Sequence, residues 1–249
     1  MTNSITPDLR PVNTLRLLID IIAAPGEALR RLSEVQPRSW WLPALLSLLS
    51  AFAYLGVTLE ETAAEAAKQV QAQMATLSAE QAAAAAPMIE RVTSPAFLFG
   101  SGAVTIVLGL LIAWGLASLV LYLGASLAGG QVKIGKLWPA IVWTWLPFAL
   151  RGFLQTAWSA IAGSLIHYPG LSFWFATGDA TADQTRPLFA LASQIDLFGL
   201  WHVVLVYLLL RLVARMGGGG AFAITLAYVV INLGVRLLPA LLGGAFRLG

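Results

Sequence analysis

Five long apolar stretches dominate the chain and restrict what it can fold into. A helix needs roughly 20 apolar residues to cross a hydrocarbon core of about 30 Å. The stretches that meet or approach this length are residues 40–58, 97–127, 138–166, 197–212 and 221–242. The sequence therefore predicts an all-α polytopic membrane bundle with five transmembrane helices. The third stretch is long for one span, so we expect it to be tilted, kinked at Pro147 or turned along the outer surface.

The composition excludes several classes of soluble protein. Hydrophobic residues make up 58% of the 249 residues and charged residues only 11%, whereas soluble domains contain about 25% charged residues. The formal charge of +3, from 15 basic and 12 acidic residues, is too small and too scattered for nucleic-acid binding. The chain has two histidines and no cysteine, which excludes disulfides, thiolate nucleophiles and cysteine-based zinc sites. We expect no nucleic-acid partner, no metal and no cofactor.

The distribution of basic residues predicts the orientation in the membrane. With the N-terminus inside, nine basic residues flank the spans on the inner side: Arg10, Arg16, Arg30, Arg31, Arg38, Lys133, Lys136, Arg211 and Arg215. Four lie on the outer side: Lys68, Arg91, Arg186 and Arg247. An excess of Lys and Arg marks cytoplasmic loops, so the sequence predicts an N-inside, C-outside protein.

Residues 1–38 are expected to form a cytoplasmic N-terminal segment ahead of the five-span membrane domain at 39–249. Leu15, Leu18, Ile19 and Ile22 recur at helical spacing, with charged residues on the remaining face. This pattern indicates an amphipathic helix. It either lies in the membrane interface, with its basic residues toward the headgroups, or packs on the bundle from the cytosol.

The outer loop at 59–95 is rich in Ala, Glu and Gln and contains no glycine, which favours helix. Ser78 followed by Gln81 forms a possible capping box for a second helix. We therefore predict an extracytoplasmic helical hairpin. Its charged surface is either solvated or docks a partner.

Six polar side chains from three predicted spans fall in the outer half of the bilayer. Arg151 lies 13 residues beyond Trp138 and Arg236 lies 15 residues beyond Ala221, which corresponds to a rise of about 20 Å in each case. The complete set is Arg151, Gln155, Asp196, His202, Asn232 and Arg236. Ionisable groups inside a membrane are energetically costly, so this set is the candidate ligand-binding site.

Three interpretations of these residues remain open. A structural network would use Asp196 to neutralise one arginine and the amides to satisfy the rest. An anionic site would place a lipid phosphate or another anion against the surplus positive charge. A third interpretation is a conduction or transport path. Alternatively, Arg151 and Arg236 extend separately to the outer interface and form no cluster.

No motif in the chain points to an enzyme. Glu60-Glu61 matches the paired glutamates of intramembrane prenyl-protein proteases only in part, because residue 65 is Glu where that motif has Arg. No Gly-x-Ser-x-Gly elbow is present, and no second histidine pair could hold a metal. We therefore assign no catalytic residue and predict a non-enzymatic protein.

Several short motifs resemble the Yip family, in its bacterial branch. They are residues 21–32 (IIAAPGEALRRL), residues 40–43 (WWLP), residues 146–155 (LPFALRGFLQ), residues 169–171 (PGL) and residues 196–202 (DLFGLWH). The resemblance covers about residues 15 to 245. It implies a five-span protein whose eukaryotic relatives are named for interaction with Rab GTPases and act in vesicle traffic, often in hetero-oligomers. No recognisable Rab-binding motif is present here, so a small-GTPase partner rests on this analogy alone.

These observations lead to two functional hypotheses. The first is a non-enzymatic Yip-type protein of the bacterial inner membrane that organises membranes, binds anionic lipid and forms homo- or hetero-oligomers. A stripe of small residues in the second span, Thr105, Gly109, Ala113 and Ala117, supports close helix packing within or between protomers. The second hypothesis is a small transporter or lipid scramblase that uses Arg151, Asp196 and Arg236 as its path.

Overall fold

The computed structural model describes residues 14–34, 40–131, 133–179, 182–183 and 185–245, with side chains as far as residue 238. Every regular element in this part of the chain is helical, which confirms the all-α fold class. In chain order the elements are α1 (Thr14–Ala23), α2 (Pro25–Glu34), α3 (Trp41–Val57), α4 (Leu59–Met74), α5 (Ala79–Thr93), α6 (Pro95–Leu127), α7 (Ile134–Thr144), α8 (Leu146–Ala162), the 3-10 helix η2 (Gly170–Phe175), α10 (Pro187–Ala192), α11 (Leu197–Leu212) and α12 (Gly218–Ala245).

The five predicted spans coincide with helical elements, although not every one passes a test of length and hydropathy. Among the described residues, α6, the α7–α8 pair and α12 are long and apolar enough to cross a membrane. Helices α3 and α4 are long and apolar enough only when they are counted together as one span, and the two are bent by 59°. Helix α11 is apolar but shorter, with 16 residues. Three or four candidate spans are thus supported, and the count of five and the orientation stay predictions.

The third span is broken where the sequence predicts a kink. Proline has no backbone N–H, and Pro147 stands in the first turn of α8. The Trp145 N–H turns back to the carbonyl of Val142, and the Phe148 N–H bonds to the carbonyl of Trp145. The carbonyl of Thr144 consequently has no helical partner and accepts a hydrogen bond from a neighbouring helix. The break therefore interrupts the helical hydrogen-bond pattern of the third span and leaves one backbone acceptor inside the bundle.

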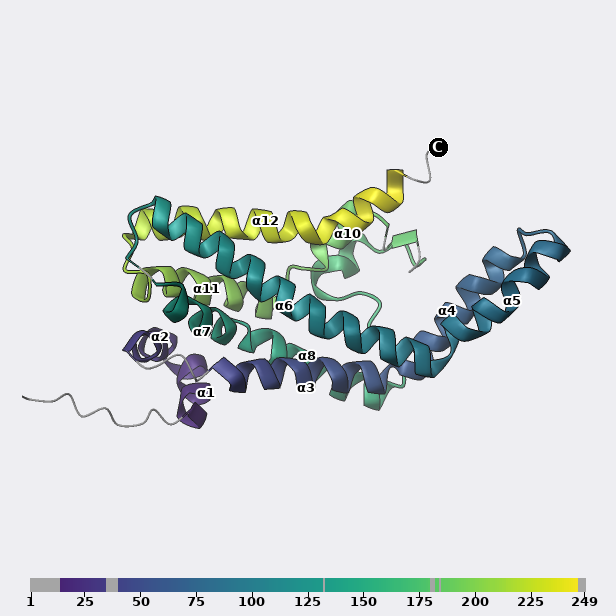
Figure 1. The fold of residues 1–249 in the computed structure, drawn as a ribbon, viewed down its shortest axis with the longest axis horizontal. Helices are drawn as coiled ribbons and strands as arrows, with labels where there is room; N and C mark the ends of the chain where they lie inside the picture. The colour runs from purple at the N-terminus through teal and green to yellow at the C-terminus, as the bar shows by residue number, and fades with distance from the viewer. Residues whose placement is uncertain (1–13, 35–39, 132, 180–181, 184, 246–249) are drawn as a thin grey trace, which may run out of the picture.

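The core lies where α7 and α11 meet the other helices (Figure 1). Trp143 of α7 and Leu205 and Leu209 of α11 are fully buried. Helix α3 packs most extensively on α8. A Cβ added at Gly152 would lie 2.9 Å from the Ser50 hydroxyl, so the glycine permits this close approach.

Helices α1 and α2 pack on the bundle at one end. Leu17 and Ile21 of α1, and Leu29 of α2, are fully buried, and α2 contacts both α7 and α11. The bundle-packing interpretation is therefore confirmed for one face. The other face of α1 exposes Ile19 and Ile22, and its insertion into the membrane interface stays a prediction.

The predicted helical hairpin is present as α4 and α5, which project from the other end of the bundle (Figure 1). The Ser78 hydroxyl accepts from the Gln81 N–H while the Gln81 side chain accepts from the Ser78 N–H, which confirms the capping box. Neither helix has a buried residue. We call this the hairpin end of the molecule.

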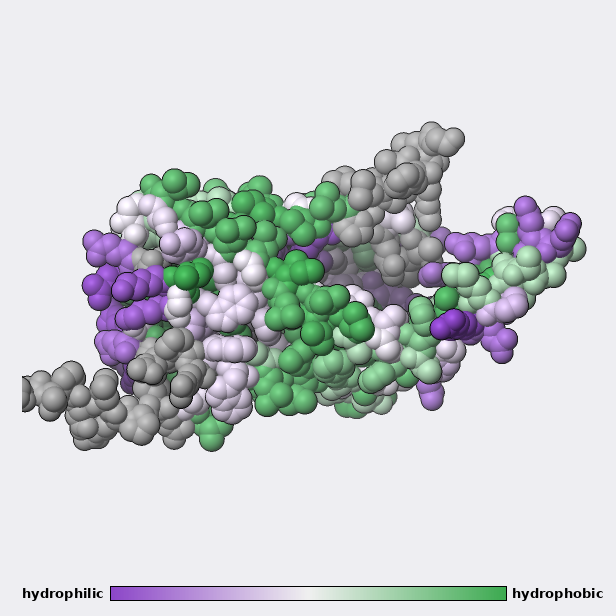
Figure 2. All heavy atoms as spheres, in the orientation of Figure 1, coloured by the Kyte–Doolittle hydropathy of each residue, from purple (hydrophilic) through white to green (hydrophobic). Residues whose placement is uncertain are grey.

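The surface separates into an apolar middle and two polar ends (Figure 2). Apolar side chains of α6 and α12, including Ile112, Leu119, Phe222 and Val230, are exposed along the middle. One polar end carries the α4–α5 hairpin, and the other lies near the first residues of α7 and α12. Exposed apolar side chains gathered in this way suit contact with lipid rather than water.

Single-cysteine labelling tests the orientation, since the native chain has no cysteine. Ala79→Cys preserves the Ser78 cap, and Gly217→Cys enters open space. In sealed, right-side-out vesicles a membrane-impermeant maleimide should label Ala79→Cys at once, and Gly217→Cys only after permeabilisation. Equal labelling of both variants before permeabilisation would contradict the predicted topology.

Candidate functional site

Arg151 and Asp196 form a partly buried ion pair between α8 and the start of α11. The Arg151 Nη1 donates to Asp196 Oδ2 at 2.8 Å, and the side chains are 25% and 16% exposed. The other carboxylate oxygen accepts from the Gly199 N–H at 2.6 Å, so Asp196 is the N-cap of α11. The guanidinium also lies 4.9 Å from the Phe148 ring centroid. Asp196 thus neutralises Arg151 and stabilises the positive end of a helix at the same time.

Arg236 of α12 is held by neutral groups instead. Its Nε donates to Asn232 Oδ1 at 2.9 Å, and its Nη1 donates to Gln194 Oε1 at 2.8 Å. Among the described side chains, none of the ion pairs includes Arg236. With Asp196 paired to Arg151, the guanidinium of Arg236 is the surplus charge of the set.

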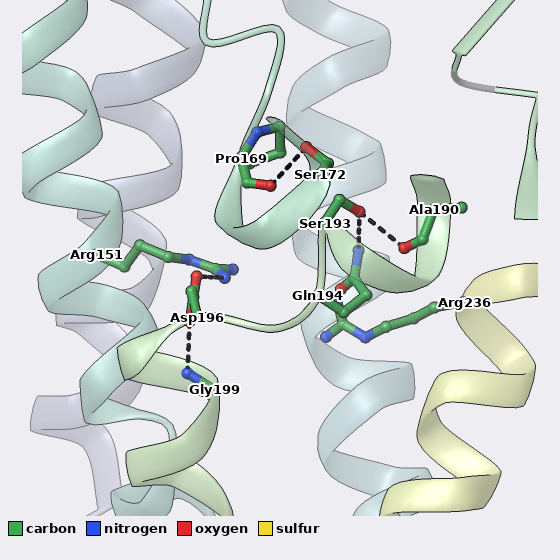
Figure 3. Close-up of polar contacts among 9 residues, drawn as sticks. All are labelled: Arg151, Pro169, Ser172, Ala190, Ser193, Gln194, Asp196, Gly199 and Arg236. Atoms are coloured by element: carbon green, nitrogen blue, oxygen red, sulfur yellow. Dashed lines mark hydrogen bonds and ion pairs between the residues drawn. The ribbon is translucent and has the colours of Figure 1, made fainter. Parts of the chain in front are cut away.

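A compact turn presents both Gln194 and Asp196 (Figure 3). Gly170 has φ +61°, and a Cβ there would lie 2.7 Å from the carbonyl oxygen of Ile195. Only glycine fits both the dihedral angle and the contact. The Leu171 N–H donates to that same Ile195 oxygen at 3.1 Å. The 3-10 helix η2 is therefore packed directly against the segment that leads into α11.

The loop between η2 and α10 is tied by a second carboxylate, Asp183. Both the N–H and the hydroxyl of Thr177 donate to it at 2.8 Å, and Arg186 donates at 3.0 Å. Burial raises the pKa of Asp183, but these hydrogen bonds outweigh that effect and hold the pKa below its ordinary value. The carboxylate therefore stabilises the loop at neutral pH, and this contribution is lost only when the pH falls through the lowered pKa.

Both arginines line two adjoining cavities. The larger, of about 670 Å³, lies between α3, α6 and α8, and we call it the arginine cavity. Its wall is mainly apolar, with polar groups from Ser50, Tyr54, Thr105 and Gln155. The smaller, of about 130 Å³, lies between α8, α11 and α12 and is also lined by Gln194 and Asn232. Arg151 and Arg236 therefore lie where the two spaces meet, and Arg236 is exposed.

Gln155 and His202 belong to the predicted set but take no part in the hydrogen bonds of the two arginines. Gln155 faces the arginine cavity, and its amide has no hydrogen-bond partner among the described residues. His202 is buried, with Nδ1 2.7 Å from the Thr144 carbonyl and Nε2 2.9 Å from the Tyr228 hydroxyl. Because a carbonyl only accepts, Nδ1 carries the hydrogen, and the neutral ring accepts from Tyr228. His202 thus joins α7, α11 and α12 as a structural link, and both its nitrogens are occupied.

The structure therefore brings Arg151, Asn232 and Arg236 to the wall of the smaller cavity, while Asp196 is joined to them through its ion pair with Arg151. Sequence reasoning missed Gln194, which bonds Arg236, and Tyr228, which bonds His202. Tyr228 lies one helical turn before Asn232, so helical spacing contained a signal for it. Among the described residues, no group of three or more His, Asp or Glu side chains is arranged to hold a metal ion.

The two arginines should differ in their effect on stability. Arg151→Gln leaves the partly buried Asp196 without its cation, so we expect a loss of about 1–3 kcal/mol and a lower thermal unfolding midpoint in detergent. Arg236→Gln leaves only neutral amides, which can bond to glutamine or water, so we expect a smaller loss.

Asp196→Asn provides the matched control, since asparagine also caps helices well. Added to Arg151→Gln, it should restore part of the lost midpoint because it removes the unpaired charge. Equal destabilisation by the two arginine variants, without this rescue, would show that the ion pair does not set the stability of the site.

Comparison with known proteins supplies the family. The model of the Yip1 domain matches residues 19–238, which covers the helices from within α1 to within α12. No curated protein and no solved structure matches the chain. The match includes α8, the turn before α11 and Arg236, so the candidate site lies within the domain. The chain is an integral membrane protein that belongs to the Yip family.

Proposed function

We propose that this Yip-family protein binds a phosphate-bearing lipid headgroup in the arginine cavity, and that it organises membrane lipid rather than catalysing a reaction. The observation that carries the proposal is the contrast between the two arginines. Asp196 neutralises Arg151, whereas Arg236 is hydrogen-bonded, among the described side chains, to the neutral amides of Asn232 and Gln194. A buried or membrane-embedded cation is stabilised by an anion, and a lipid phosphate is the anion most available in a bilayer.

The chemistry of the guanidinium supports a phosphate ligand. Arginine offers five N–H donors in a planar fork that matches phosphate oxygens. Arg151 donates to Asp196 through Nη1, and Arg236 donates to the two amides through Nε and Nη1. Donors on both side chains therefore remain for a phosphate at the boundary of the two cavities.

The size and lining of the arginine cavity support a lipid rather than a bare ion. Its volume of about 670 Å³ lies within the usual range of about 300–1,000 Å³ for small-molecule sites. The apolar walls from α3 and α6, including Leu55 and Ile106, suit an acyl chain, while the Gln155 amide can donate hydrogen bonds to glycerol or ester oxygens. Such a mixed lining is unsuited to a fully hydrated anion.

The proposal also holds that the protein is non-enzymatic and that it works as an oligomer. His202 has both ring nitrogens hydrogen-bonded, so it is not free to act as a base. In the small-residue stripe of α6, Ala117 is buried, whereas Gly109 is exposed and is available for contact with another protomer. We place the protein in the bacterial inner membrane, as an oligomer.

Native mass spectrometry of protein released from lipid nanodiscs tests the binding proposal. In nanodiscs that mix phosphatidylglycerol with phosphatidylcholine, the wild type should retain phosphatidylglycerol. In Arg236→Gln the phosphatidylglycerol bound at the arginine cavity should be held about tenfold more weakly, which corresponds to a loss of about 1.4 kcal/mol. The same spectra give the mass of the oligomer.

Arg91→Gln is the matched control, because it also removes one positive charge at the hairpin end but lies on exposed α5, away from the cavity. It should retain lipid as the wild type does. A wild-type particle without retained lipid would contradict the proposal, as would equal losses in both variants. Lipid transfer between leaflets of reconstituted vesicles, abolished by Arg236→Gln, would instead favour the scramblase alternative.

A further inference from the structure

A second basic pocket lies at the end of the bundle opposite the hairpin. It has a volume of about 270 Å³ and lies where α2 and α11 end and α7 begins. Its lining residues are Ser33, Gln131, Lys133, Lys136, Val213 and Arg215. This is a different place from the arginine cavity and shares no residue with it.

The charge of this pocket is strongly one-sided. Lys133, Lys136 and Arg215 all line it, and none of the three forms an ion pair with the described carboxylates. Glu34, which follows Ser33, also forms no ion pair with any basic residue that the structure describes. Even with Glu34 counted, three positive charges against one negative leave a net charge of +2. Three cations held close together repel one another, and an anion between them removes that repulsion.

The pocket is built by contacts between three segments. The Gln131 N–H donates to the Ala214 carbonyl at 3.0 Å, which joins the loop before α7 to the turn after α11. The Lys136 ammonium donates to the Ser33 carbonyl at 3.0 Å, which joins α7 to the end of α2. Arg215 has φ +54°, a conformation rare for a residue with a side chain. The cations are thus presented by a folded framework rather than by a disordered tail.

The start of α7 adds to the attraction for an anion. Lys133 is the N-cap of this 11-residue helix, and its side chain makes no capping hydrogen bond. A helix N-terminus carries a partial positive charge and N–H groups directed outward. The small, largely polar wall leaves little space for an apolar ligand. The charge, the size and the helix end all favour a compact anion.

We propose that this pocket binds a phosphate group, either on a lipid headgroup of the adjacent leaflet or on a soluble phosphorylated compound. The two sources share one chemistry, in which Lys133, Lys136 and Arg215 surround the phosphate oxygens. The inference does not depend on the lipid proposed for the arginine cavity, because the two sites use different residues at opposite ends of the bundle.

The test uses the full-length protein in nanodiscs of phosphatidylcholine alone, titrated with inorganic phosphate and followed by isothermal calorimetry. A parallel sample with phosphatidylglycerol is examined for retained lipid. The variant Lys133→Gln/Arg215→Gly removes two charges, and glycine relieves the positive φ at 215, so the fold is not put under added strain. Arg30→Gln is the control, since Arg30 is an exposed basic residue of α2 outside the pocket.

Phosphate binding that weakens at least tenfold in the double variant, but not in Arg30→Gln, would support the pocket with a soluble source. Retained phosphatidylglycerol that is lost in the same pattern would support a lipid source. Lys133→Gln/Arg215→Gly leaves the arginine cavity intact, so the phosphatidylglycerol that the double variant still retains measures the lipid bound in that cavity. No binding in either arm would overturn the proposal, as would equal weakening by Arg30→Gln.

Discussion

The ion pair between Arg151 and Asp196 is the interaction on which the site depends. It joins the middle of the third span to the first turn of α11, and the same carboxylate caps that helix. Two charges taken out of water are tolerated only when they are paired and hydrogen-bonded. Among the described residues, Asp196 pairs with Arg151, and Arg236 bonds to amides instead. The surplus charge of the set therefore lies on Arg236.

The break in the third span gives rise to a second polar link between the helices that carry the ion pair and Arg236. Pro147 interrupts the helix, and the Thr144 carbonyl is released from the helical pattern. The Nδ1 of His202 donates a hydrogen bond to this carbonyl, and its Nε2 accepts one from the Tyr228 hydroxyl of α12. Three helices are thereby held around one buried polar link, one turn or more from the ion pair.

Hydropathy and local chemistry predicted a large part of this structure. The apolar stretches located the helices, Pro147 located the break, and Ser78 with Gln81 located the start of α5. Helical rise also placed Arg151 and Arg236 at similar depth, and charge balance favoured Asp196 as a partner. Gln194 could not be predicted, because it lies in a turn without periodicity and meets Arg236 across 42 residues of sequence. The arginine cavity could not be predicted either, because its wall is assembled from α3, α6, α8 and α12, which are far apart in the sequence.

The central claim is that Arg236 contacts a lipid phosphate. Solid-state NMR with ¹⁵N-labelled arginine in phospholipid bilayers measures this contact directly, through the dipolar coupling between guanidinium nitrogen and ³¹P. The account predicts a coupling that corresponds to about 4 Å, the separation expected for a charge-assisted hydrogen bond, and its disappearance in Arg236→Gln. A wild-type spectrum whose ³¹P coupling is unchanged by Arg236→Gln would contradict it.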